Sequence, residues 1–204
     1  MELQQAIAQI ADIRLQMSRT RQFRGLGAAA TLATAIAAGV AAVWQAERIP
    51  DPLNRPQQFV LLWVSVAGLC VAISAIEVLR RYRADDSPLQ HELTRHAVEQ
   101  FLPSLIVGGL LTLVICQDAP AAIWMLPGLW QIIIALGLFA SRQLFPMPIF
   151  FVGSFYAVCG LINLTGVVPH LSPWSMAVPF GVGQLANSAV LYFSLERRHA
   201  ASNE

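Results

Sequence analysis

Long uninterrupted apolar runs dominate the pattern of this chain. They are continuous rather than alternating, and lipid offers no partner for backbone polar groups outside a helix or a closed barrel, so each run predicts a helix. A helix crosses the hydrocarbon layer in about 20 residues. Six runs approach that length, at approximately 26–44, 59–79, 101–116, 121–140, 149–168 and 174–195. The sequence therefore predicts an all-α fold, a polytopic six-transmembrane-helix bundle.

The third run is the weakest, because 101–116 has only 16 residues. It spans a bilayer only if it borrows residues 97–100 or if the bilayer thins locally. Before it, Ser87 and Pro88 have the form of a helix start, with a Ser cap and a Pro at the first helical position. We therefore expect a short cytoplasmic helix from Pro88 toward Phe101, with Pro103 marking the bend or first turn of the third span.

The N-terminal 24 residues predict an amphipathic helix. Its apolar side chains recur at helical spacing, and glutamines and arginines occupy the other positions. The apolar face comprises Leu3, Ile7, Ile10 and Met17. Such a face lies in the lipid headgroup region, which we favour, or packs against a partner helix. The predicted division of the chain is 1–24 for this helix, 25–196 for the transmembrane domain and 197–204 for a tail.

The arginines predict the orientation. Eleven of the 13 basic residues fall at the two termini and in the second and fourth connections, whereas only Arg48 and Arg55 lie on the other side. The positive-inside rule makes the arginine-rich side cytoplasmic, so we expect both termini in the cytoplasm and the chain in the cell's inner membrane. Tryptophans favour the opposite, outer ends of the runs. Four lie there, Trp44, Trp63, Trp124 and Trp174, and only Trp130 lies deeper in its run.

Composition supports a membrane protein. Of the 204 residues, 56% are hydrophobic and only 12% are charged, against about 25% in soluble domains. The net charge of +1 argues against a nucleic-acid binder that works through bulk charge. All basic residues are Arg and Ala is abundant, which favours a GC-rich bacterial source.

The titratable residues form no recognisable catalytic or metal site. His91 and His96 resemble a zinc-protease signature, but they are five residues apart, about 140° around a helix, and cannot ligate one metal. No charged residue lies near the middle of a run; the nearest, Glu77, is expected to pair with Arg81 at i+4. Cys70, Cys116 and Cys159 show no ligand spacing. We therefore expect no enzymatic activity, no cofactor and no metal.

Neutral polar residues in the last three runs are the candidate site. The fourth and sixth runs each place a Pro in their outer third and a Gln near the midplane. A Pro in a spanning helix frees a carbonyl and permits a kink. The candidate residues are Gln131, Gln184, Asn187, Tyr156 and Asn163. They either form hydrogen bonds between helices, which we favour, or line one polar pocket.

The first run repeats small residues at every fourth position, at Ala29, Ala33, Ala37 and Ala41, with a second row beside it at Ala30, Thr34, Ala38 and Ala42. Small residues let helix backbones approach closely. The pattern fits internal packing or a homodimer equally well.

Three segments of the chain, 23–25, 126–131 and 172–176, resemble small uncharacterised bacterial multi-pass membrane proteins with no assigned activity, so the resemblance implies no functional residue. The first hypothesis is a non-catalytic inner-membrane protein that acts through cytoplasmic-face or helix–helix contacts. The alternative is a small permease or channel for an uncharged or weakly polar solute. Expected partners are the lipid bilayer and either a cytoplasmic protein or further copies of the chain, with no nucleic acid.

Overall fold

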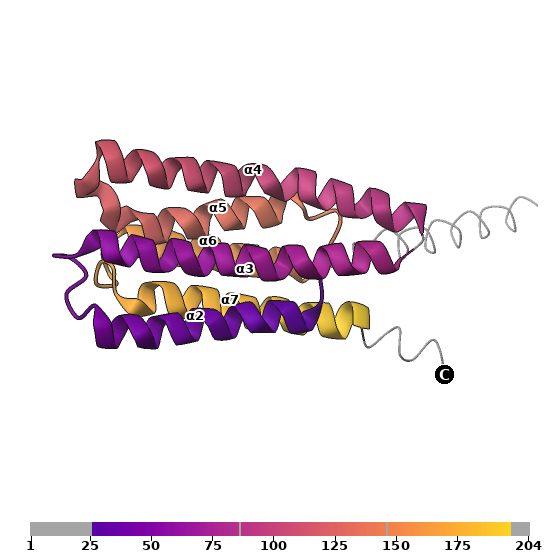
Figure 1. Cartoon of the computed structure of the whole chain (residues 1–204), viewed down its shortest axis with the longest axis horizontal. Helices are drawn as coiled ribbons and strands as arrows, with labels where there is room; N and C mark the ends of the chain where they lie inside the picture. The colour runs from indigo at the N-terminus through magenta and orange to yellow at the C-terminus, as the bar shows by residue number, and fades with distance from the viewer. Residues whose placement is uncertain (1–25, 86, 146, 197–204) are drawn as a thin grey trace, which may run out of the picture.

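The computed structural model describes residues 26–85, 87–145 and 147–196. Over these residues all regular structure is helical, and six α-helices lie side by side with alternating chain direction (Figure 1). They are α2 (Ala28–Arg48), α3 (Pro56–Ala84), α4 (Pro88–Asp118), α5 (Leu126–Ala140), α6 (Ile149–Leu164) and α7 (Pro173–Leu191). A 3-10 helix, η1 (Pro120–Met125), precedes α5, and a π turn, η2 (Tyr192–Glu196), follows α7. The predicted N-terminal helix with Leu3, Ile7, Ile10 and Met17, and the tail 197–204, lie outside the described residues.

Five helices are long and apolar enough to cross a membrane, if η1 is counted with α5 and part of η2 with α7. The chain is therefore a multi-pass membrane protein. The remaining helix, α6, is apolar but has only 16 residues. The sixth span accordingly stays a prediction.

The helices extend past the apolar runs that predicted them. The clearest case is α4, which continues through Pro103 as one helix of 31 residues, so the predicted short cytoplasmic helix and the third span are one continuous helix and Pro103 lies in its interior. Pro103 removes one backbone hydrogen bond without ending the helix. Pro88 does occupy the first turn, but the Ser87 side chain makes no capping hydrogen bond. Instead, the Ser87 backbone N–H donates to Oδ1 of Asp85 at 2.9 Å.

The two ends of the bundle differ in their side chains. One end carries the connections 49–55, 119–125 and 165–172, and we call it the tryptophan end because the four predicted boundary tryptophans gather there. Trp44 and Trp174 are exposed, whereas Trp63 is buried and the ring of Trp124 lies 4.5 Å from that of His170. The opposite end carries the connections 85–87 and 141–148 and most of the described arginines, and we call it the arginine end.

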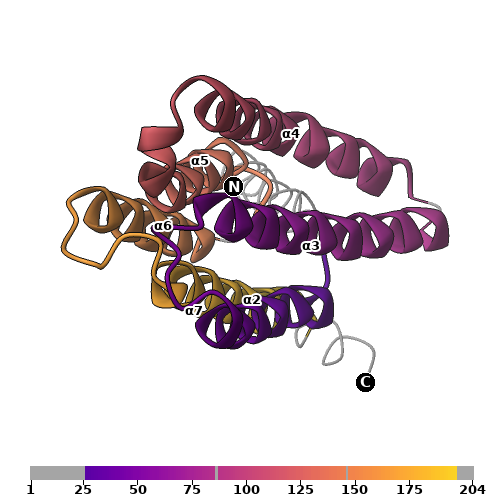
Figure 2. The ribbon, with the colours of Figure 1, turned by 60° about the vertical axis from the view of Figure 1, so that its left-hand side comes forward.

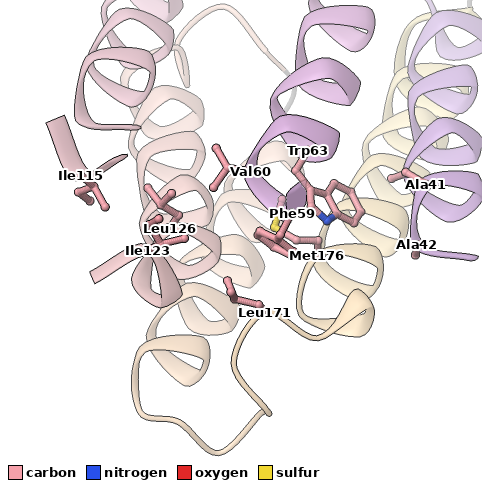
Figure 3. Close-up of a cluster of buried hydrophobic side chains, with 11 residues drawn as sticks. Ala41, Ala42, Phe59, Val60, Trp63, Ile115, Ile123, Leu126, Leu171 and Met176 are labelled. Atoms are coloured by element: carbon pink, nitrogen blue, oxygen red, sulfur yellow. The ribbon is translucent and has the colours of Figure 1, made fainter. Parts of the chain in front are cut away.

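The largest apolar core lies near the tryptophan end. Figure 3 shows Trp63 directed from α3 toward Ala41 and Ala42 of α2, with Phe59 and Met176 beside it. The helices group around this core with α2 along α7 and α5 along α6 (Figure 2). In contrast, only 17% of the most apolar 18-residue stretch of α3 is buried, and the same holds for α4. Both helices therefore turn most of their apolar surface outward.

Small residues set the closest helix approaches. In α2, three residues of the second predicted row, Thr34, Ala38 and Ala42, are buried. Of the first row, Ala41 is buried and Ala29 is exposed. Because α2 lies along α7, this buried face serves packing inside the chain. The α5–α6 contact is made by two glycines: a Cβ added to Gly128 would lie 2.7 Å from the backbone oxygen of Gly160, and a Cβ on Gly160 2.8 Å from that of Gly128.

Candidate functional site

Two of the five candidate residues meet at a single backbone carbonyl. Gln131 of α5 is fully buried, and its Nε2 donates to the carbonyl oxygen of Ser175 in α7 at 2.8 Å. Nδ2 of Asn163, in α6, donates to the same oxygen at 3.1 Å and to Oε1 of Gln131 at 3.0 Å. We call Gln131, Asn163 and the Ser175 carbonyl the amide lock, because together they join α5, α6 and α7.

Pro179 explains why this carbonyl is available. In a regular helix the Ser175 oxygen would accept the backbone N–H of residue 179, but proline has none. The carbonyl is therefore freed inside the bundle, where an unpaired polar group is costly and water is scarce. The two side-chain amides supply the missing donors. The sequence predicted the freed carbonyl, and the structure identifies its partners.

Tyr156 lies about two helical turns from the amide lock, toward the middle of the bundle. Its ring is buried against Gly183 of α7, where an added Cβ would be 2.5 Å from Cζ of the tyrosine. Asn187 follows Gly183 by one turn and is also buried. Among the described residues, the Tyr156 hydroxyl and Oδ1 of Asn187 have no hydrogen-bond partner.

Gln184 belongs to neither group. It follows Gly183 directly, and successive residues of an α-helix point about 100° apart, so it is turned away from the Tyr156 contact. The side chain is half-buried. The five candidate residues are thus divided between the amide lock, the Tyr156–Asn187 region and a separate position on α7.

A second buried glutamine, Gln45, was missed by the sequence interpretation because it directly follows the predicted run 26–44. Gln45 is the fourth residue from the end of α2 and is fully buried. Its Nε2 donates to the Leu171 carbonyl at 2.8 Å, and its Oε1 accepts the indole N–H of Trp63 at 2.7 Å. Leu171 has a φ of 56°, in the left-handed region, so this bond holds an unusual turn before α7. The available signal was a Gln directly after Trp44, at the end of an apolar run.

The one tryptophan predicted to lie deeper is also hydrogen-bonded inside the bundle. Nε1 of Trp130 in α5 donates to Oγ1 of Thr112 in α4 at 2.9 Å. The Thr112 hydroxyl in turn donates to the Gly108 carbonyl at 2.7 Å. This chain ties α4 to α5.

Several titratable residues of the arginine end form local pairs. Arg81 Nε lies 2.6 Å from Glu77 Oε1, which confirms the predicted i,i+4 pair. His91 stacks on Tyr82 with ring centroids 4.1 Å apart, and its Nε2 lies 2.9 Å from the Tyr82 carbonyl oxygen. His96 instead lies near two glutamates of its own helix. Within the described ranges, no group of three or more His, Cys, Asp or Glu side chains is placed to hold a metal ion.

Comparison with known protein families, characterised proteins and solved structures finds no match to this chain. The amides at the amide lock and at Gln45 are used for joining helices. The Tyr156–Asn187 region retains unused hydrogen-bonding capacity.

Proposed function

We propose that the chain is a non-catalytic membrane protein of six spans that acts through protein contacts, chiefly at the arginine end. The observation that supports this most is the use of the interior amides: both hydrogen-bonding ends of Gln131 and of Gln45 are bound to neighbouring segments of the same chain. Side chains engaged in this way stabilise the bundle and leave the outer surface to interact with other molecules.

The hairpin of α3 and α4 is the surface that we propose makes these contacts. At 1.5 Å per residue, the 29 residues of α3 and the 31 of α4 extend about 44 and 46 Å, against a hydrocarbon layer of about 30 Å. Figure 1 shows both helices reaching beyond α5 and α6 at the arginine end. Each helix therefore exceeds the apolar layer by about 14–16 Å, which corresponds to about three turns.

The projecting part is braced and carries charges of both signs. The His91–Tyr82 stack joins the start of α4 to the end of α3. Arg95 donates from Nε to Oε1 of Glu99 at 2.7 Å, one turn further along α4. A rigid helical hairpin with mixed charge suits a protein partner better than a nucleic acid, which selects positive charge.

Site-specific photocrosslinking in native membranes tests this proposal. A crosslinker placed at the exposed positions Arg83 or Leu89 should yield one discrete product, whose mass separates a second copy of the chain from a different protein. Leu53, exposed at the tryptophan end, is the matched control and should yield none. The proposal fails if the hairpin positions yield no product, or if Leu53 gives the same one.

The six-span topology with cytoplasmic termini has its own test. With α6 as a span, a reporter that works only in the cytoplasm should be active after residues 24, 90, 145 and 204 and silent after 52 and 171. The 16 residues of α6 cover about 24 Å, so the bilayer has to thin or the flanking residues have to enter it. Activity after residue 171 would show that α6 does not cross.

The unpaired polar atoms of Tyr156 and Asn187 favour a second candidate function, a small permease for an uncharged solute. Proteoliposomes that contain the chain should then swell in glycerol or urea faster than empty liposomes, and Asn187→Leu should abolish the difference. Equal swelling of both preparations would argue against transport of these solutes.

A further inference from the structure

Two polar atoms in the middle of the bundle lack partners. Tyr156 is 1% exposed and Asn187 9% exposed, and neither the Tyr156 hydroxyl nor Oδ1 of Asn187 has a hydrogen-bond partner among the described residues. Buried polar groups in proteins are almost always hydrogen-bonded, to protein or to an ordered water. Two such atoms on adjacent helices therefore indicate a missing third group.

Both atoms are placed by the same stretch of α7. A Cβ added to Gly183 would lie 2.6 Å from the Tyr156 hydroxyl oxygen, so that oxygen lies directly over the glycine. Residues four apart in a helix have Cβ atoms about 5–6 Å apart, and helical side chains lean toward the N-terminus. Asn187 accordingly leans toward the space that the Tyr156 hydroxyl occupies. No direct hydrogen bond joins the two atoms, so each keeps hydrogen-bonding capacity for one small molecule between them.

The surroundings restrict what this molecule is. The Phe180 ring lies 5.5 Å from that of Tyr156, and Ala135 and Val152 pack with the tyrosine in one apolar cluster. These neighbours are apolar, so an ion placed among them would lose its hydration without gaining a partner from their side chains. Oδ1 of Asn187 accepts only, whereas a phenol hydroxyl both donates and accepts. The ligand must therefore be small and neutral, and must carry a hydrogen-bond donor.

We propose that Tyr156 and Asn187 hold one water molecule at the contact between α6 and α7. The water donates to Oδ1 of Asn187 and shares a hydrogen bond with the Tyr156 hydroxyl. Gly183 is the residue that leaves room for this arrangement, since a side chain there would displace the tyrosine ring. The Ser175 carbonyl of the amide lock lies eight residues before Gly183 along α7, about 12 Å toward the tryptophan end.

Magnetisation transfer from water to the protein in solid-state NMR tests this directly. The chain is labelled with ¹³C at the tyrosine Cζ atoms and placed in deuterated lipid, and it then gives signals from Tyr82, Tyr156 and Tyr192. The signal that disappears in the Tyr156→Phe variant is that of Tyr156. Tyr82 is 41% exposed and sets the rate for a hydrated ring. We expect the Tyr156 signal to build up at a comparable rate despite its burial.

Asn187→Leu should slow the build-up at Tyr156 several-fold and leave that at Tyr82 unchanged. Gln184→Leu, on the same helix but turned away, is the matched control and should leave both rates as in the parent. A parent protein without transfer to Tyr156 would overturn the proposal whether or not the variants fold. Unchanged transfer in a folded Asn187→Leu protein would also overturn it, because Asn187 would then not hold the water.

Discussion

Replacement of both side-chain donors of the amide lock, Gln131→Leu together with Asn163→Leu, should destabilise the bundle. The chief reason is that the buried Ser175 carbonyl loses its hydrogen-bond donors. Ser175 would keep its oxygen in a buried position with no donor, because Pro179 cannot supply one. The same pair of replacements made together with Pro179→Ala should cost much less. The backbone N–H restored at position 179 then forms the regular helical bond to that oxygen.

The structure allows the difference to be estimated. The double replacement removes three hydrogen bonds. At about 0.6 kcal/mol each in a membrane bundle, their loss costs about 2 kcal/mol. Leaving a buried acceptor unsatisfied costs about 1–3 kcal/mol, a penalty that overlaps with the loss of its two bonds. With Pro179→Ala present, only the bond between Gln131 and Asn163 is lost without compensation, about 0.6 kcal/mol. The expected coupling between Pro179 and the pair is therefore about 1–2 kcal/mol.

The assay is the free energy of unfolding in bicelles, measured by steric trapping for the four corners of the cycle. Thr112→Val breaks the Trp130–Thr112 bond between α4 and α5, and serves as a control that should show no coupling to Pro179. An equal loss of stability with and without Pro179→Ala would refute the reasoning, because the two amides would then not be compensating for the proline.

Two further predictions concern other buried contacts. Gln45→Leu leaves a tryptophan indole N–H and a backbone carbonyl without partners, so it should lower the free energy of unfolding by about 1–3 kcal/mol, whereas the exposed Gln58→Leu should have little effect. Gly128→Ala forces a methyl against the Gly160 carbonyl and should cost about 1–3 kcal/mol, while Gly39→Ala, with open space around it, should be neutral or slightly stabilising. Neutral effects of both Gln45→Leu and Gly128→Ala would mean that these buried contacts contribute little to stability.

Features that depend on neighbours in the sequence were predicted well. The apolar runs located the helices, because hydrophobic length is a local property. The Glu77–Arg81 pair follows from i,i+4 spacing. The carbonyl freed by Pro179 follows from the chemistry of one residue and its position in a helix. None of these three features depends on which helices pack together.

Features that depend on helix rotation and on the choice of neighbours were not predictable. Gln131 and Asn163 meet in the amide lock, whereas Tyr156 and Asn187 lie in a separate region. This grouping depends on how α5, α6 and α7 are rotated toward one another. The first predicted helix ends before Gln45, because a polar residue directly after an apolar run marks the end of that run. A partner 126 residues away, the Leu171 carbonyl, stabilises it inside the bundle.

The pairing of α2 with α7 has a consequence for biosynthesis. These two helices form one of the two most extensive contacts in the described part of the chain, yet they are its first and last α-helices. From the end of α2 at Arg48 to the start of α7 at Pro173 the ribosome adds about 125 residues, which at about 5–20 residues per second takes roughly 6–25 s. During that interval α2 is in the membrane without its main partner. The small-residue face of α2 must then be covered by lipid or by the insertion machinery until translation of the last helix is complete.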